Sequence, residues 1–78
     1  MGVEFNQQLM AERIKKARGA RNMTQEQLAG IVGVDGNAVS NWERGANVPS
    51  VQRLDAICRA LDVTPDFLLG YAGDLAVA

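Results

Sequence analysis

The hydrophobic positions of this chain repeat with the period of an α-helix, and no alternating strand pattern competes with them. Near the start, Met10, Ile14 and Ala17 recur at i, i+4 and i+7, which places them on one helical face. A later stripe of the same kind consists of Leu54, Ile57, Cys58 and Leu61. We therefore predict an all-α protein with five helices, at about residues 6–21, 25–32, 36–44, 51–61 and 65–69.

Residues that favour helix ends stand at the borders of these segments. Thr24, Asp35 and Thr64 are expected N-caps, because their side-chain oxygens can accept hydrogen bonds from first-turn amides. Gln27 stands three residues after Thr24, which completes a capping box. Gly33 tolerates positive φ and is expected to end the second helix.

The second and third predicted helices are separated by only a few residues around Gly33. So short a connection sets two helices at a steep angle, as in a helix-turn-helix. Close crossing needs a small residue at the contact, and Ala29 is in the right place. The apolar residues spaced to hold the third helix against the body are Val34, Val39 and Trp42.

The opposite face of the third helix should then point outward, and it is polar with little charge. Its residues are Gly36, Asn37, Ser40, Asn41 and Arg44. Asn can bond bidentately to adenine in the major groove of DNA, and Ser can bond to several base edges. We interpret this face as one that reads base pairs, with an ordinary solvated surface as the alternative.

Length and composition limit the other possibilities. The 78 residues indicate one domain, which we place at residues 1–70, followed by a short C-terminal tail at 71–78 that is either disordered or in contact with a dimer partner. With no His and one Cys, we expect no metal site, no cofactor and no enzymatic activity. Cys58 is expected to be a packed core thiol. Without a membrane-length apolar run or a signal peptide, we expect a cytoplasmic protein with no membrane partner.

The net charge of −1 hides an uneven distribution. Five of the eight basic residues fall within nine positions, at Arg13, Lys15, Lys16, Arg18 and Arg21. This cluster is either a solvated helix face or a phosphate-facing patch, and charge alone does not decide between them. The free amides at the start of the second helix would attract a phosphate without any side-chain charge. We therefore expect DNA binding of moderate affinity with a shallow salt dependence.

Several stretches together resemble the phage-repressor and Cro-like helix-turn-helix family (Cro/C1-type, or XRE family). They are MTQEQLA at 23–29, WERG at 42–45, VPS at 48–50 and ALDVTPDFLLG at 60–70. The resemblance spans about residues 9–70. It implies a compact five-helix, lambda-repressor-like domain whose third helix enters the major groove of DNA.

The resemblance also implies a role for each matching position. The base-reading positions fall on Gly36, Asn37, Ser40 and Asn41. Contacts to the DNA backbone, or support for the reading helix, fall on Gln25 and Arg44. With them we place Thr24, at the start of the second helix, and Arg13 and Lys16 of the basic cluster. Arg18 and Glu43 occupy the places of a structural ion pair. Because Gly36 has no side chain where many members carry a base-reading one, readout there should be weak.

From the pattern and the resemblance together, we expect a sequence-specific transcriptional regulator that binds double-stranded DNA. It is expected to act as a repressor, binding a pseudo-palindromic operator as a homodimer. The dimer surface would combine the fifth helix with the tail around Tyr71, Leu75 and Val77. The alternative is a protein-interaction module, such as an antitoxin that binds a toxin and represses its own promoter.

Overall fold

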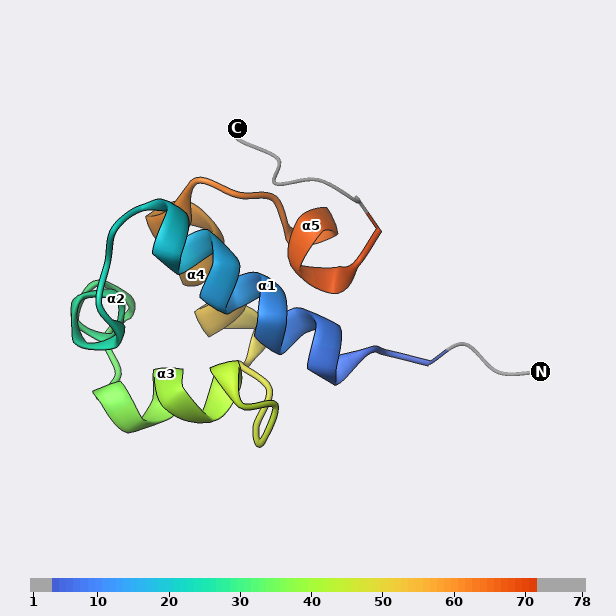
Figure 1. Ribbon diagram of the computed structural model, residues 1–78, viewed down its shortest axis with the longest axis horizontal. Coiled ribbons are helices and arrows are strands. Elements are labelled where there is room, and N and C mark those ends of the chain that lie inside the picture. The colour runs from blue at the N-terminus through green and yellow to red at the C-terminus, as the bar shows by residue number, and fades with distance from the viewer. Residues whose placement is uncertain (1–3, 72–78) are drawn as a thin grey trace.

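The computed structural model describes residues 4–71, which contain five α-helices joined by short loops (Figure 1). In chain order they are α1 (Gln7–Ala20), α2 (Gln25–Val32), α3 (Gly36–Glu43), α4 (Val51–Leu61) and α5 (Pro65–Leu69). The predicted all-α class is confirmed, and each helix lies within one residue of its expected bounds. Leu75 and Val77, which were assigned to the dimer surface, lie outside the described residues.

Local capping explains where these helices begin. The N-caps expected at Thr24, Asp35 and Thr64 are confirmed, because each side chain accepts a hydrogen bond from an amide of its own first turn. Thr24 and Gln27 also form the complete capping box. The first helix starts one residue later than predicted, because Asn6 has extended backbone and is its N-cap.

Left-handed residues explain where several helices end. Gly33 ends α2 with φ of 89°, as expected. Asp62 ends α4 in the same way with φ of 55°, which the hydrophobic period did not reveal. The next residue, Val63, donates its amide to the carbonyl of Cys58 at 3.0 Å and is itself buried. This arrangement has the backbone bond and apolar contact of a Schellman motif.

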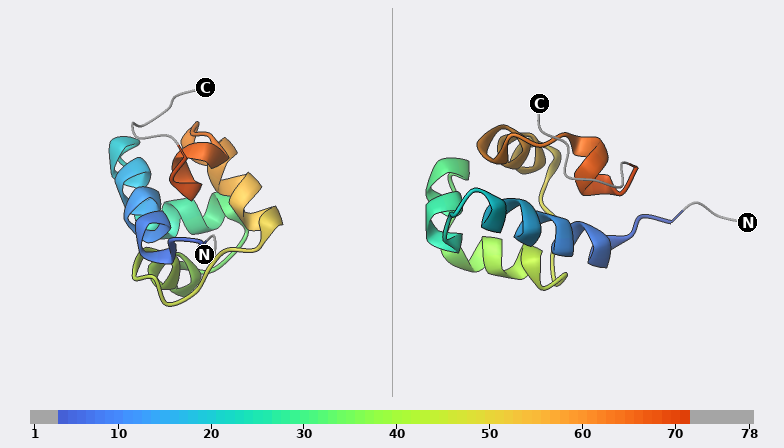
Figure 2. Two further views of the ribbon diagram at one scale, coloured as in Figure 1. Left: turned by 90° about the vertical axis from the view of Figure 1, so that its right-hand side faces the viewer. Right: turned by 45° about the horizontal axis from the view of Figure 1, so that its top comes forward.

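Helix α1 runs through the middle of the molecule and contacts α3, α4 and α5 (Figures 1 and 2). Helix α2 contacts α3 and α4, and α3 lies along the side of α1 opposite α5. The largest fully buried side chains come from all five helices: Ile14, Leu28, Val39, Ile57, Leu61, Phe67 and Leu68. The expected core position of Cys58 is confirmed, and burial raises the pKa of its thiol, with the charge of Asp55 adding to the shift.

Arg13 of α1 and Arg21, the C-cap residue of the same helix, fasten α1 to α5 and to the end of α4. Arg13 donates to the carbonyl of Phe67 in α5 at 2.8 Å, and its guanidinium lies 4.8 Å from the centre of the Phe67 ring. Arg21 donates to the carbonyl of Leu61 at 2.8 Å, at the end of α4, and pairs with the carboxylate of Asp62 at 3.5 Å. These arginines therefore brace the fold, a role that neither interpretation of the basic cluster anticipated.

Within residues 4–71, none of the helices is both long and apolar enough to cross a membrane. The same residues bring together no group of three or more His, Cys, Asp or Glu side chains able to hold a metal ion.

Candidate nucleic-acid interface

The predicted helix-turn-helix is formed by α2 and α3. Ala29 is 2% exposed at the crossing, and its carbonyl accepts hydrogen bonds from the amides of Gly33 and Val34 at 2.8 and 2.9 Å. The chain therefore leaves α2 through a tight, hydrogen-bonded turn. Val39 and Trp42 are buried, so the opposite face of α3 is turned away from the core. In Figure 1 this helix forms one edge of the molecule.

The structure brings the expected base-reading residues together along two turns of α3. Asn37 is exposed, whereas Gly36, Ser40 and Asn41 are partly buried. Arg44, the C-cap of α3, is exposed and its guanidinium donates to the side-chain oxygen of Asn41. Any other donor to the Asn41 side-chain oxygen must share or replace this hydrogen bond.

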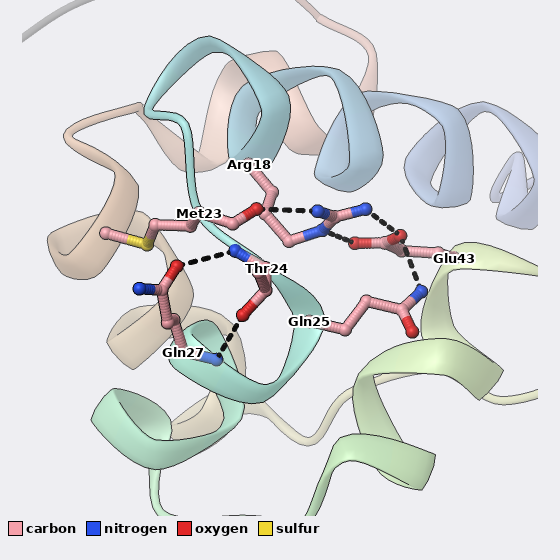
Figure 3. Close-up of polar contacts among 6 residues, drawn as sticks. All are labelled: Arg18, Met23, Thr24, Gln25, Gln27 and Glu43. Atoms are coloured by element: carbon pink, nitrogen blue, oxygen red, sulfur yellow. Dashed lines mark hydrogen bonds and ion pairs between the residues drawn. The ribbon is translucent and has the colours of Figure 1, made fainter.

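An ion pair holds the C-terminal end of α3 against α1 (Figure 3). Arg18 donates to both carboxylate oxygens of Glu43, with N–O distances of 2.6 and 2.9 Å, and to the carbonyl of Met23 at 2.7 Å. The Glu43 side chain is 3% exposed and the Arg18 side chain 15%. The hydrogen bond to Glu43 is the main cause of a raised Arg18 pKa, against the opposing effect of burial. The structural ion pair expected from the sequence is thus present.

Gln25, the first residue of α2, joins the same network. Its side-chain nitrogen donates to Glu43 at 3.1 Å (Figure 3). Two roles were open for Gln25, a phosphate contact or support for the reading helix, and this hydrogen bond favours support. Because Glu43 accepts from both α1 and α2, the ends of three helices meet at one buried carboxylate.

The start of α2 also lies beside the start of α3. The capping box engages the amides of Thr24 and Gln27, at 2.8 and 3.0 Å, and leaves the first-turn amides of Gln25 and Glu26 without intrahelical partners. Such amides attract an anion. Glu26 is exposed, and its side chain reaches over to Gly36, where a Cβ atom would stand 3.6 Å from the Glu26 Cγ. No local pattern of residues indicates this contact between α2 and α3.

Arg53 of α4 also has a structural role that the sequence analysis did not predict. It donates to the carbonyl of Val32 at 3.0 Å and thereby caps the C-terminus of α2. The two residues are 21 positions apart, so no local pattern could have paired them. This contact fixes the end of α2 that leads into the turn.

The two lysines of α1 are exposed and lie on different sides of the helix. Lys15 is one helical turn from Arg18, and Arg18 faces α3 because it bonds to Glu43. The position of Lys15 on the helix therefore places its side chain toward α3. Lys16 is one turn from Arg13, which contacts α5, so its register places it toward α5. Of the two, Lys15 is the better placed for a surface centred on α3, although Lys16 was the one expected there.

Comparison with known proteins defines the class. A helix-turn-helix family model matches residues 14–68, so the chain belongs to the helix-turn-helix family. Among curated proteins it is 42% identical over 72 residues to the Repressor protein C2 of Salmonella phage P22, covering 92% of this chain and 32% of that protein. The resemblance to phage repressors seen in the sequence is thereby confirmed.

Two further relatives are named for other roles. The chain is 39% identical over 67 residues to the HTH-type transcriptional activator BcrR of Enterococcus faecalis, covering 86% of this chain and 30% of that protein. It is 32% identical over 56 residues to Antitoxin PezA of Streptococcus pneumoniae, covering 72% of this chain and 35% of that protein. The chain thus spans about a third of the length of these curated relatives.

A solved structure resembles the fold closely. The crystal structure of the P22 c2 repressor in complex with a synthetic operator aligns with a TM-score of 0.76 and 42% sequence identity. The alignment covers 80% of this chain and 94% of the repressor chain.

Proposed function

We propose that this chain is a sequence-specific, DNA-binding transcriptional regulator that places α3 in the major groove. The observation that carries the proposal is that the outer face of α3 presents the side-chain amides of Asn37 and Asn41, while the rest of the helix is fixed to the core. Val39 and Trp42 fix one side of α3 to the core, and the ion pair of Glu43 fixes its end. The P22 repressor structure with a synthetic operator supports this use of the fold.

The chemistry of the outer face suits direct readout. Asn37 is the most open of the amides, and Asn41 lies one turn further along the same face. Either can present a donor and an acceptor to the N7 and N6 positions of adenine. Ser40 between them can donate or accept. On binding, Arg44 turns from Asn41 toward a phosphate, which frees the Asn41 oxygen for a base.

Phosphate contacts position the domain on the duplex. The first-turn amides of α2 and its dipole attract one phosphate. Arg44 at the end of α3 and Lys15 on the α3 side of α1 supply side-chain charge. Since Arg13 and Arg21 are engaged within the fold, the phosphate contacts are few.

We propose further that the regulator works as a homodimer on a pseudo-palindromic operator, because one α3 spans only a few base pairs. The proposed contact lies at the end of α5, where Phe5 is 47% and Tyr71 80% exposed. With Glu4 and Leu69 they line a shallow recess of about 260 Å³. Phe5→Ser with Tyr71→Ser should give a monomer in analytical ultracentrifugation, whereas Val51→Ser, at an 83% exposed site on α4, should not. A dimer that survives the double change contradicts this surface.

Repression is the proposed outcome of binding, in the cytoplasm. A bound protein represses simply by occupying DNA that the polymerase needs, whereas activation requires an additional contact surface. The relatives include both a repressor and an activator, with the repressor the more similar. A promoter fusion with the operator placed inside the promoter tests this: expression should fall when the protein is present.

The Antitoxin PezA relative favours a second candidate, a module that binds a protein partner and also represses its own promoter. Asn37 and Asn41 separate the two functions. Changing both to Ala should remove sequence preference, with a loss of about 1–3 kcal/mol per base contact. Binding to a protein partner should be unaffected by the same change.

The matched control is Gln52→Ala, at an exposed polar position on α4. It should bind the preferred duplex as the unchanged protein does. If the Asn37 and Asn41 double variant also retains full preference for that duplex, α3 is not the reading helix.

A further inference from the structure

The contact between Glu26 and Gly36 places a carboxylate at the start of the reading helix. Around the position that a Gly36 Cβ would occupy, Glu26 contributes Cγ at 3.6 Å, Oε1 at 3.6 Å and Cδ at 3.7 Å. Glu26 is the second residue of α2 and Gly36 the first residue of α3. The Glu26 side chain of α2 therefore lies beside the position at which α3 lacks a side chain.

The Glu26 carboxylate is available for a ligand. Asp35, the other acid at this end of α3, is engaged as N-cap and accepts the amide of Ala38 at 3.0 Å. In the described part of the chain, no hydrogen bond or ion pair engages the Glu26 side chain, and the residue is exposed. It therefore lies beside the N-terminal end of α3 with its acceptor oxygens open.

We propose that Glu26 determines specificity by accepting a hydrogen bond from the N4 amino group of a cytosine opposite Gly36. This inference rests on the proposed function of α3 as the reading helix. A carboxylate offers acceptors only. The major-groove edge of cytosine offers a donor, guanine and thymine present acceptors, and adenine places the N7 acceptor beside its amino group. The carboxylate thus favours cytosine and repels guanine.

Gly36 is the first of the expected base-reading positions. The missing side chain of Gly36 was expected to weaken readout there. Its absence instead leaves room for Glu26 to reach the same region from α2. A Cβ atom at this place would stand at ordinary van der Waals distance from Glu26, so the glutamate side chain packs directly beside Gly36.

The test begins with the duplex that the unchanged protein selects from a random pool. Each base pair of one half-site is then replaced in turn by the other three, and binding is measured for the unchanged protein, Glu26→Gln and Glu26→Ala. The unchanged protein should prefer cytosine at one position by roughly five- to tenfold. Both variants should lower that preference to less than about twofold and keep the preferences at other positions. Glu12→Gln, an exposed glutamate on α1, is the matched control and should change none of them.

The alternative is that Glu26 only complements the positive end of the α3 dipole. In that case both variants would alter affinity by the same factor for every duplex, and the base preferences would persist. That result overturns the inference and leaves the proposed function standing. If the unchanged protein selects no duplex, the proposed function itself fails and the inference with it. Circular dichroism of each variant confirms that the helices remain folded.

Discussion

Arg18 of α1 and Glu43 of α3 form an ion pair in which two nitrogens of the guanidinium meet the two carboxylate oxygens at 2.6 and 2.9 Å. The pair is nearly buried and joins positions 25 apart in the sequence. Because Glu43 is the last residue of α3, this contact sets the direction in which the outer face of the helix points.

Removing the arginine should be strongly destabilising. Arg18→Met leaves the Glu43 carboxylate, 3% exposed, with only the amide of Gln25 as a partner. We expect a loss of about 3–5 kcal/mol in the free energy of unfolding, measured by urea denaturation. The double variant Arg18→Met with Glu43→Met should be more stable than Arg18→Met alone, because no unpaired charge is left buried.

The control for this prediction is Arg59→Met. Arg59 pairs with Asp55 at 3.0 Å in a pair whose side chains are 80% and 61% exposed, so its loss should hardly change stability. If Arg18→Met lowers the free energy of unfolding as little as Arg59→Met does, the ion pair between α1 and α3 does not stabilise the fold.

Two glycines of the helix-turn-helix should respond to alanine in opposite directions. Gly30 lies within α2, and a Cβ added there would meet no atom within 4 Å. Gly30→Ala should therefore stabilise the protein by about 0.5–1 kcal/mol. Gly33 has φ of 89°, so Gly33→Ala should destabilise it by about 1–2 kcal/mol. Urea midpoints compare the two directly, and changes of the same sign would contradict the assigned backbone conformations.

Cys58 should react slowly in the folded protein. Burial, helped by the charge of Asp55, raises its pKa above the ordinary 9.0, so the thiol stays protonated at neutral pH. Because the folded pKa is the higher one, this group favours folding below pH 9.0 and loses that effect as pH rises through the folded pKa. Labelling with a thiol-reactive disulfide at pH 8 should be much faster in urea than in buffer. Equal rates would show that the thiol is accessible.

DNA binding should depend weakly on salt. If Arg44 and Lys15 are the phosphate contacts of each protomer, a dimer makes about four, and log affinity against log salt should have a slope of about −4. Arg44→Gln removes one contact from each protomer and should lower the magnitude of the slope by about 2. Arg59→Gln on α4 should leave the slope unchanged. Titrations over a range of salt concentrations measure this, and a slope near −10 would contradict the small number of contacts.

The sequence predicted those parts of the fold that depend on neighbours along the chain. The capping box of Thr24 and Gln27 involves residues three apart, and the helix faces follow from the period. Asp62 was missed although a local signal existed, since Asp tolerates the left-handed conformation better than most residues. The helix-turn-helix itself could be predicted because its turn is short and its buried residues are regularly spaced.

Contacts between distant segments could not be predicted in this way. The carbonyl acceptors of Arg13 and Arg21 lie 54 and 40 positions away along the chain. A cluster of basic residues in the sequence therefore could not reveal that these side chains brace the core. The expected ion pair of Arg18 and Glu43 came from family resemblance, not from spacing. The approach of Glu26 to Gly36 depends on how α2 and α3 cross, and the hydrophobic period does not specify that geometry.

The most direct test of the proposed function is selection of bound duplexes from a random DNA pool at moderate salt. We expect a two-fold-symmetric motif with half-sites about one helical turn, or ~34 Å, apart. Such a motif would show that a dimer reads DNA through two copies of α3. Recovery of no motif above background would contradict sequence-specific binding by this chain and favour the protein-partner alternative.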